Sequence, residues 1–469
     1  MCLEREVERL RVENSELRQA LAVSQTQIAE LTQQLAVGLE RVIELEAQVG
    51  APKHPPAFVK PKGQQAEGER PPRKKRAKRH NTSRKRAQPT RIERHALAHC
   101  PDCHYQLRGE SLDYCRQVIE LPPPQPVEVI EHQVVKRWCP RCEHWRSPQL
   151  NLSGQVIGQG RVGVRVAALV CYLRTTLRLP VRQVQSYLAT LHQLHLSIGE
   201  IVALAHRVRQ QLQGRADQLL AQVRKQAVVH QDETGWRENG QNGYVWVTAS
   251  DGAEAVRYYE YSPSRSHQVA LRLLGERFRG LLVSDFYAAY NLVPGRHQRC
   301  WSHLLGDLHE LKELQAQRVE VVEWAQAVRQ LYDQAQQWLA DHPAPTVEQR
   351  RHEYAELYQQ AWRLGQQHAY DSRHPCWALA KRLLRHQEEL FQFLLQPGVP
   401  ADNNLAERSL RPLVILRKIS GGTRSKEGSH TRLTLASLLA TWQARHLNPF
   451  LECLAALQQP AQLPQAAPP

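Results

Sequence analysis

The chain has 469 residues, which is enough for about three domains and at least one large hydrophobic core. Lys and Arg number 62 against 46 Asp and Glu, so the formal net charge is +16 and predicts a polyanionic partner. The ordinary content of aromatic and charged residues excludes collagen-like, mucin-like and wholly disordered proteins. No run of 18 apolar residues occurs and the first residues are charged, so we expect no membrane contact, no secretory signal and a cytoplasmic location.

Residues 1–50 repeat apolar side chains at alternating spacings of four and three. One series resembles the a positions of a parallel coiled coil, with a single polar Asn14, and the other resembles the d positions. We expect a leucine zipper that forms a homodimer or a higher oligomer; packing of this helix on the chain's own core is the alternative. The repeat positions are Leu3, Val7, Leu10, Asn14, Leu17, Leu21, Ser24, Ile28, Leu31, Leu35, Gly38, Val42, Leu45 and Val49.

Residues 51–97 form a basic, proline-containing segment with too few apolar residues for a core, which predicts a disordered linker. Between residues 52 and 99 the chain carries 15 Lys or Arg and three acidic residues. Such a tether binds DNA phosphates without sequence specificity because counterions are released; a solvated spacer is the alternative. The predicted DNA contacts of this segment are Arg73, Lys74, Lys75, Arg76, Lys78 and Arg79.

Residues 98–150 contain two CxxC pairs, Cys100 with Cys103 and Cys139 with Cys142. Each pair can present two thiolates to one side of a Zn²⁺, so the two pairs predict a Cys₄ site with one structural zinc ion. The residues between the pairs are rich in β-formers and predict strands of a zinc ribbon. Cys115 is expected to be an ordinary small apolar residue, and four unliganded structural cysteines are the alternative.

Residues 160–224 are predicted to be helical. One helix begins near Val181, and a second follows Ser197, whose spacing from Glu200 is typical of a capping box. The two helices suit a helix-turn-helix or an ordinary helical hairpin, and both interpretations remain open.

Residues 225–450 change to β-like patterns. Strands are expected at 227–233, 244–250 and 255–262, joined by turns at 241–243 and 251–252. A helix within 264–278 follows, and then a short strand at 280–285 that ends in Asp285. This order is the one expected of an RNase H-like core, in which Asp232 on the first strand approaches Asp285.

A third carboxylate is expected from a late helix that carries Glu407, with Asn404 and Asn403 three and four residues before it on the same face. Asn403 is expected to support the site without holding the metal ions itself. Three carboxylates hold two Mg²⁺ or Mn²⁺ ions while leaving room for a phosphate. His230 shares a strand face with Asp232 and either supports the site or is a packed strand histidine. Residues 304–395 predict a helical insertion, and residues 451–469 the end of a helix and a tail.

The segments HQDETGW, YVWV, SRS, GLLVSDFYAAYN, CWSHLLGDL and DNNLAERSLRPLVILRK together resemble the transposases of the insertion sequence 66 family of DDE enzymes. That family also begins with a leucine zipper and a Cys-rich zinc-binding segment, so the resemblance covers almost the whole chain. It implies an RNase H-like domain whose catalytic triad falls on Asp232, Asp285 and Glu407. It also implies a bacterial, nucleoid-associated protein that acts on double-stranded DNA, both element ends and target, and that works with accessory transposition proteins in some cases.

The implied chemistry is metal-dependent cleavage at the ends of an insertion sequence followed by strand transfer. Water first attacks the phosphodiester and frees a 3′-OH, which then attacks target DNA. Within the CWSH motif, Cys300 and Trp301 are expected to be structural, and His303 is expected to contact the site or DNA. A basic group flanks Glu407 where a DNA backbone would pass; a solvated basic face is the alternative. Its members are Arg408, Arg411, Arg417, Lys418, Arg424 and Lys426.

The sequence thus predicts a multidomain α+β protein. Its parts are a coiled coil, a zinc ribbon, a helical DNA-binding region and an RNase H-like α/β catalytic core with a helical insertion. Two other functions remain open: a structure-specific nuclease with the same three carboxylates, and a non-catalytic zinc-ribbon regulator that binds DNA.

Overall fold

A computed structural model describes residues 87–459 and part of the stretch from 7 to 34. The chain divides into two compact units, residues 1–120 and 121–469. The described residues between 7 and 34 are helical and exposed, and they include the heptad positions Val7 and Leu21. The rest of the predicted zipper, the linker up to residue 86 with its Arg73–Arg79 cluster, and the tail from residue 460 lie outside the described residues.

The segment between the two cysteine pairs differs from the prediction. Described residues 107–136 contain no helix or strand, so the ribbon strands expected there are wrong. The prolines at 122–124 and 126 lack the N–H groups that a strand ladder needs, which explains the absence of strands at those positions. A short antiparallel hairpin does form next, from β1 (Arg137–Cys139) and β2 (His144–Arg146), with Trp138 packed edge-on against Trp145.

Three helices follow, and the predicted capping box is confirmed. They are α2 (Val164–Thr175), α3 (Val181–His192) and α4 (Ile198–Val223). The Ser197 side chain accepts from the backbone N–H of Glu200, and the Glu200 carboxylate accepts from the backbone N–H of Ser197. These reciprocal bonds satisfy donors that the first turn of a helix leaves free, and so fix the start of α4.

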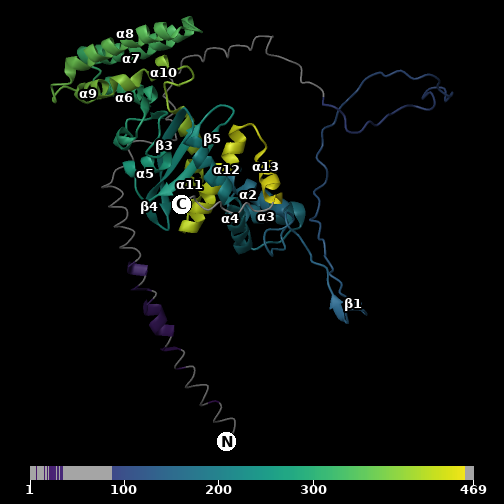
Figure 1. Cartoon of the computed structure of the whole chain (residues 1–469). Helices are drawn as coiled ribbons and strands as arrows, with labels where there is room; N and C mark the ends of the chain where they lie inside the picture. Colours follow the sequence, from purple (N-terminus) through teal and green to yellow (C-terminus); the bar gives the residue numbers. More distant parts are fainter. Residues whose placement is uncertain are drawn as a thin grey trace. The chain divides into compact units, whose positions relative to one another are not determined.

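A mixed five-stranded sheet forms the centre of the second unit, with the order β5-β4-β3-β6-β7 (Figure 1). The first three strands are antiparallel, and β6 and β7 add to β3 in parallel. The predicted meander, the following helix and the fourth strand are confirmed. The strands are β3 (Val228–Glu238), β4 (Gln241–Ser250), β5 (Val256–Ser262), β6 (Leu281–Ser284) and β7 (Arg296–Arg299).

One predicted turn is misplaced. Residues 241–243 are paired within β4, and the chain reverses instead at Asn239 and Gly240, whose φ angles are 51° and 77°. Two consecutive left-handed residues give the tight hairpin whose twist matches that of the strands, and an Asn-Gly pair favours it. The first strand therefore extends to Glu238, five residues beyond its predicted end.

Helices cover the sheet and extend from its β7 edge. Helices occupy the region of the predicted helical insertion, and the first of them already begins at Trp301. The insertion enters and leaves the core at one point, because the N–H of Trp301 donates to the carbonyl of Ala401 over 3.0 Å. The remaining helices of the second unit are α5 (His267–Leu274), η2 (Ala288–Leu292), α6 (Trp301–Leu314), α7 (Val319–Asp341), α8 (Val347–His368), α9 (Trp377–Leu390), α10 (Gln392–Leu395), α11 (Asn404–Ser420), α12 (Lys426–Ala444) and α13 (Pro449–Gln458).

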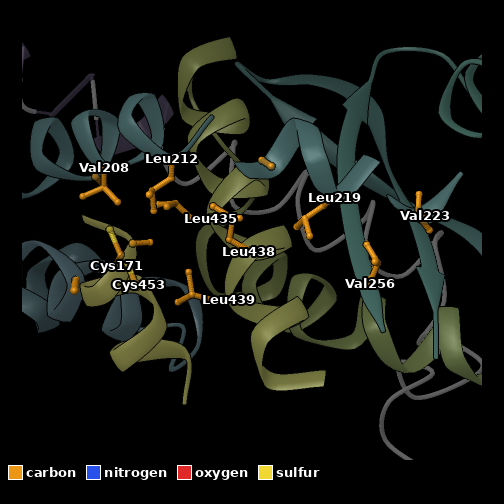
Figure 2. Close-up of a cluster of buried hydrophobic side chains, with 14 of the residues drawn as sticks. Cys171, Val208, Leu212, Leu219, Val223, Val256, Leu435, Leu438, Leu439 and Cys453 are labelled. Atoms are coloured by element: carbon orange, nitrogen blue, oxygen red, sulfur yellow. The ribbon is translucent and has the colours of Figure 1, made fainter. Parts of the chain in front are cut away.

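The period of two along β4 divides the core between the two faces of the sheet. Val245, Val247 and Ala249 pack with residues of α11 and α12, whereas Trp246 lies in a second cluster with α4 and α5. Figure 2 shows side chains of α4, such as Leu212, beside those of α12, such as Leu438, in that second cluster. Helices α2 to α4 thus share their core with one face of the sheet. Among the described helices, none combines the length and the apolarity that crossing a bilayer requires.

Candidate active site

Two of the predicted carboxylates are placed by the register of β3 and β6. The parallel pairs are Val228 with Leu281 and His230 with Val283, and partners in such pairs point to the same face of a sheet. The next step of two along each strand leads to Asp232 and Asp285. Both carboxylates therefore lie on one face, at the end where β6 stops and β3 continues.

The third carboxylate comes from α11, which packs on β3 and β4. Glu407 lies in its first turn, and Asn403 precedes the helix. The fully buried Asn403 donates from Nδ2 to the carbonyl of Gln231 over 2.8 Å, and its Oδ1 lies 3.1 Å from Nδ1 of His230. These bonds fix the start of α11 to the two residues of β3 that precede Asp232, and so hold Glu407 over the sheet.

The electrostatics of Asp232 show that negative charges converge on it. Burial, then the charges of Glu233, Asp285 and Glu407, raise the pKa of Asp232 to about 7. A pocket of about 430 Å³ opens beside it. Carboxylates that repel one another in this way favour a cation between them. The pocket is lined by Asp232, Glu233, Thr234, Glu407, Leu410, Arg411, Val414 and Ile415.

Asp285 is held through its backbone by a fully buried arginine on β7. Nη1 of Arg299 donates to the carbonyl of Asp285 over 2.9 Å, and Nη2 donates to Asn291 over 2.7 Å. Nε of Arg299 lies 2.5 Å from the carboxylate of Glu389, which also accepts from His386. Burial alone would raise the pKa of Glu389, but the hydrogen bond with His386 and the charge of Arg299 lower it to about 2. The ion pair is therefore charged at neutral pH.

His303 lies at the edge of the carboxylate group. Its Nδ1 is 3.8 Å from Oε1 of Glu407. A hydrogen bond with Cys300 raises the pKa of His303 to about 9, and the negative charges of Asp285 and Glu407 also raise it. Cys300, His303 and Glu407 bring one ligand atom each to within 4.8 Å of one another, so this corner can also hold a metal ion. Cys300 and Trp301 are fully buried, and Cys300 accepts from the N–H of Asn403.

The predicted DNA-binding residues of α11 divide into two groups. Arg408, Arg411 and Lys418 are exposed, and Arg411 lines the pocket. Arg417 instead donates to the carbonyl of Gly235 and fastens α11 to β3. Arg424 and Lys426 are also exposed. Arg424 lies just before α12, and Lys426 is its first residue.

Each cysteine pair is described within its own unit. Cys100 and Cys103 lie in the first unit, where the N–H of Cys100 donates to the carbonyl of Tyr105 and closes a tight turn. Cys139 and Cys142 flank the turn of the β1–β2 hairpin in the second unit. Backbone hydrogen bonds with Cys103 and with Cys142 lower the pKa values of Cys100 and Cys139, respectively, which favours thiolates.

Sequence patterns missed two residues that shape the site. The side chain of Glu233 is almost fully buried, where Nε of Arg265 donates to it over 2.7 Å and Tyr290 also donates to it. Its charge contributes to the raised pKa of Asp232. Arg299 was missed because its strand reads RHQR, which lacks apolar residues although three of the four residues are buried. The adjacent acidic pair at 232–233 is the one signal that pointed to Glu233.

Asn403→Ala is expected to lower the free energy of unfolding by about 1–3 kcal/mol, because it leaves the buried carbonyl of Gln231 and the ring of His230 without partners. Chemical denaturation measures this change. Asn404→Ala, in the next, half-buried position, serves as the matched control and should change the stability less. Equal stability of the Asn403→Ala variant and the wild type would contradict the assigned role of Asn403.

Comparison with known proteins supports a family assignment. The family model described as "Transposase IS66 family" matches residues 159–431, more than half of the chain, and this range includes all three carboxylates. The chain is also similar to three proteins of Sinorhizobium fredii (strain NBRC 101917 / NGR234), each described as uncharacterized. Uncharacterized protein y4jO is 30% identical over 208 residues, which are 40% of this chain and 60% of that protein.

The other two similarities extend further along the chain. Uncharacterized protein y4qI is 25% identical over 268 residues (51% of this chain, 49% of that protein), and uncharacterized protein y4jD is 25% identical over 316 residues (62% and 61%). The chain thus spans about half to three fifths of the length of these relatives. With a family model that matches most of its second unit, the chain belongs to the IS66 family of transposases.

Proposed function

We propose that this protein is a DDE transposase that cleaves DNA at the ends of an insertion sequence and joins the freed 3′-OH to a target. The observations that support the proposal are geometric: the register of β3 and β6 brings Asp232 and Asp285 to one face of the sheet, and Glu407 of α11 lines the same pocket as Asp232. The order β5-β4-β3-β6-β7, with three antiparallel and two parallel strands, supports an RNase H-like catalytic core.

The residues present fit two Mg²⁺ or Mn²⁺ ions. Asp232, Asp285 and Glu407 offer carboxylate oxygens, the ligands that these hard cations prefer, and their mutual repulsion is relieved when a cation binds. Bound there, such ions activate the attacking oxygen and stabilise the leaving oxygen in phosphoryl transfer. Asn403 positions Glu407, Arg299 positions Asp285, and His303 lies close enough to Glu407 to orient its carboxylate or to contact DNA.

DNA is proposed to pass along α11. Arg408, Arg411 and Lys418 are exposed on the helix that carries Glu407, so a phosphate backbone that contacts them is led toward the pocket. The basic linker at residues 51–97 would add contacts without sequence specificity. The zipper would bring two or more copies together, as joining both ends of an element requires, in the bacterial cytoplasm at the nucleoid, and accessory transposition proteins would assist.

The proposal is tested by incubating the purified full-length chain with Mg²⁺ and DNA that carries the element's own ends. New 3′-OH ends at the element boundary and covalently joined products are the expected results. Cleavage of branched DNA without joined products would favour the structure-specific nuclease. DNA binding without cleavage in either Mg²⁺ or Mn²⁺ would favour the non-catalytic regulator.

The proposed Cys₄ site gives a separate prediction. Cys139→Ser is expected to remove one zinc ion per chain, because a structural zinc site rarely survives the loss of one of four thiolates. Atomic absorption of the purified protein measures the loss. Cys115→Ser is the matched control, since Cys115 is exposed and stands outside both CxxC pairs. Equal zinc contents in the wild type and the Cys139→Ser variant would refute the site.

A further inference from the structure

Three zinc-type ligands meet in the connection between α8 and α9, within the helical insertion. His368 is the last residue of α8, Cys376 is the N-cap of α9, and His374 lies between them. Each offers one ligand atom, and the three atoms lie within 4.8 Å of one another. None of these residues belongs to the carboxylate site or to the CxxC pairs.

The two imidazole rings lie face to face. They stack in parallel, with centroids 3.9 Å apart and planes 2° from parallel. Trp324 of α7 packs edge-on against His368, with the ring centroids 5.8 Å apart. Nδ1 of His374 accepts a hydrogen bond of 3.2 Å from the backbone N–H of Cys376, so this nitrogen directs its lone pair toward the cysteine. A metal ion would bind this imidazole through Nε2, or through Nδ1 once the N–H of Cys376 is displaced.

The surroundings favour a cation. Cys376 is fully buried and both histidines are half-buried, so the ligands are largely shielded from water. The negative charge of Glu320, at the start of α7, acts on His368, on His374 and on Cys376. Arg318 pairs with Glu320 through an Nε–Oε1 contact of 2.8 Å, and at Cys376 the positive charge of Arg318 acts more strongly than the negative charge of Glu320.

We propose that His368, His374 and Cys376 bind a structural Zn²⁺ that ties the end of α8 to the start of α9. Imidazole nitrogen and thiolate sulfur are the ligands that zinc prefers, at about 2.0–2.3 Å. A tetrahedral site needs its ligand atoms about 3.5 Å apart, so the cluster reaches that geometry by side-chain rotations that open the ring stack. Water or Glu320 takes the fourth position. This zinc is additional to the one expected at the CxxC pairs and does not depend on transposase activity.

The test measures the zinc content of the full-length chain in the Cys139→Ser background, which removes the other zinc site. One zinc per chain is expected to remain, and to be lost when Cys376→Ser or His368→Gln is added. His368→Gln alters a half-buried helix end, so it provides a second variant if Cys376→Ser does not fold. Substitution with Co²⁺ gives a second readout, because a thiolate-to-cobalt absorption band should appear only when Cys376 is present.

His342→Gln is the matched control. His342 stacks on Trp338 at the end of α7 and stands outside the cluster, so its replacement should leave the zinc content unchanged. The proposal is overturned if Cys139→Ser protein contains no zinc and shows no thiolate-to-cobalt band. It is also overturned if the zinc content of that background is the same with and without His368→Gln and Cys376→Ser. In both cases the cluster is an ordinary packed pair of histidines beside a core cysteine.

Discussion

Replacing Asp232 by asparagine is expected to lower Mg²⁺-dependent cleavage at least about a thousandfold, which corresponds to about 4 kcal/mol of transition-state stabilisation. The proposed site uses Asp232 as a metal ligand, and a neutral amide retains the shape of the carboxylate but not its charge. Quantifying 3′-OH ends on element-end DNA measures the loss. Glu407→Gln should reduce cleavage similarly, whereas Asp251→Asn, at an exposed carboxylate beyond β4, should leave it unchanged.

The same substitution is expected to stabilise the metal-free protein. The folded-state pKa of Asp232, about 7, lies above its ordinary value of 3.8, so the folded chain binds this proton more tightly than the unfolded chain does. The contribution of Asp232 to stability therefore falls as the pH rises from about 4 to about 7. Asp232→Asn should raise the free energy of unfolding in chelator at about pH 8 by about 1–3 kcal/mol, and by less at about pH 5. Full cleavage activity, or a less stable metal-free variant, would contradict the carboxylate cluster.

Replacing Arg299 by leucine is expected to lower the free energy of unfolding by about 3–5 kcal/mol. The change leaves the carboxylate of Glu389 without its buried cation and removes the donors to Asp285 and Asn291. Urea denaturation monitored by circular dichroism measures the loss. Arg329→Leu is the matched control, because the exposed pair of Arg329 with Asp333 is worth less than about 1 kcal/mol.

Removing both partners of the buried pair separates its two effects. Arg299→Leu with Glu389→Leu should be less destabilised than the sum of the two single variants, because no uncompensated buried charge remains. Cleavage activity should still fall in the double variant, since the carbonyl of Asp285 has lost its donor. A single Arg299→Leu variant as stable as Arg329→Leu would refute the role of this ion pair.

The strands that carry the site were predictable because their residues are apolar or β-branched and their turns contain glycine. The runs around Asp232 and before Asp285 gave the first and fourth strands of the sheet. The turn between the first two strands was predicted at the wrong residues because Asn239-Gly240 and Gly243 can both form a turn. Only the pairing of β3 with β4 shows that the turn lies at Asn239-Gly240. The predicted ribbon strands are absent around residues 122–126 because a proline run lacks the N–H groups of a strand ladder, which β-propensity does not take into account.

The groups that hold the carboxylates in place were harder to predict. Arg299 lies on a strand of polar residues that is buried only because the insertion packs over it, a contact between segments far apart in the sequence. Asn403 was expected to support the site, but its two bonds to β3 become visible only when α11 is docked. The apolar side chains of α3 and α4 pack into the core shared with the sheet. Such packing occurs both in a helix-turn-helix and in an ordinary helical hairpin, so DNA binding by these helices stays a prediction.

The position of Glu407 after the insertion has a consequence for synthesis of the protein. Asp232 and Asp285 leave the ribosome before α6 to α10, whereas Glu407 follows them and is fixed only when Asn403 reaches β3. A nascent chain, or a product truncated within the insertion, therefore lacks Glu407 although it contains all five strands of the sheet. For the proposed metal site, this order of the elements means that the third carboxylate becomes available only after translation has passed the insertion.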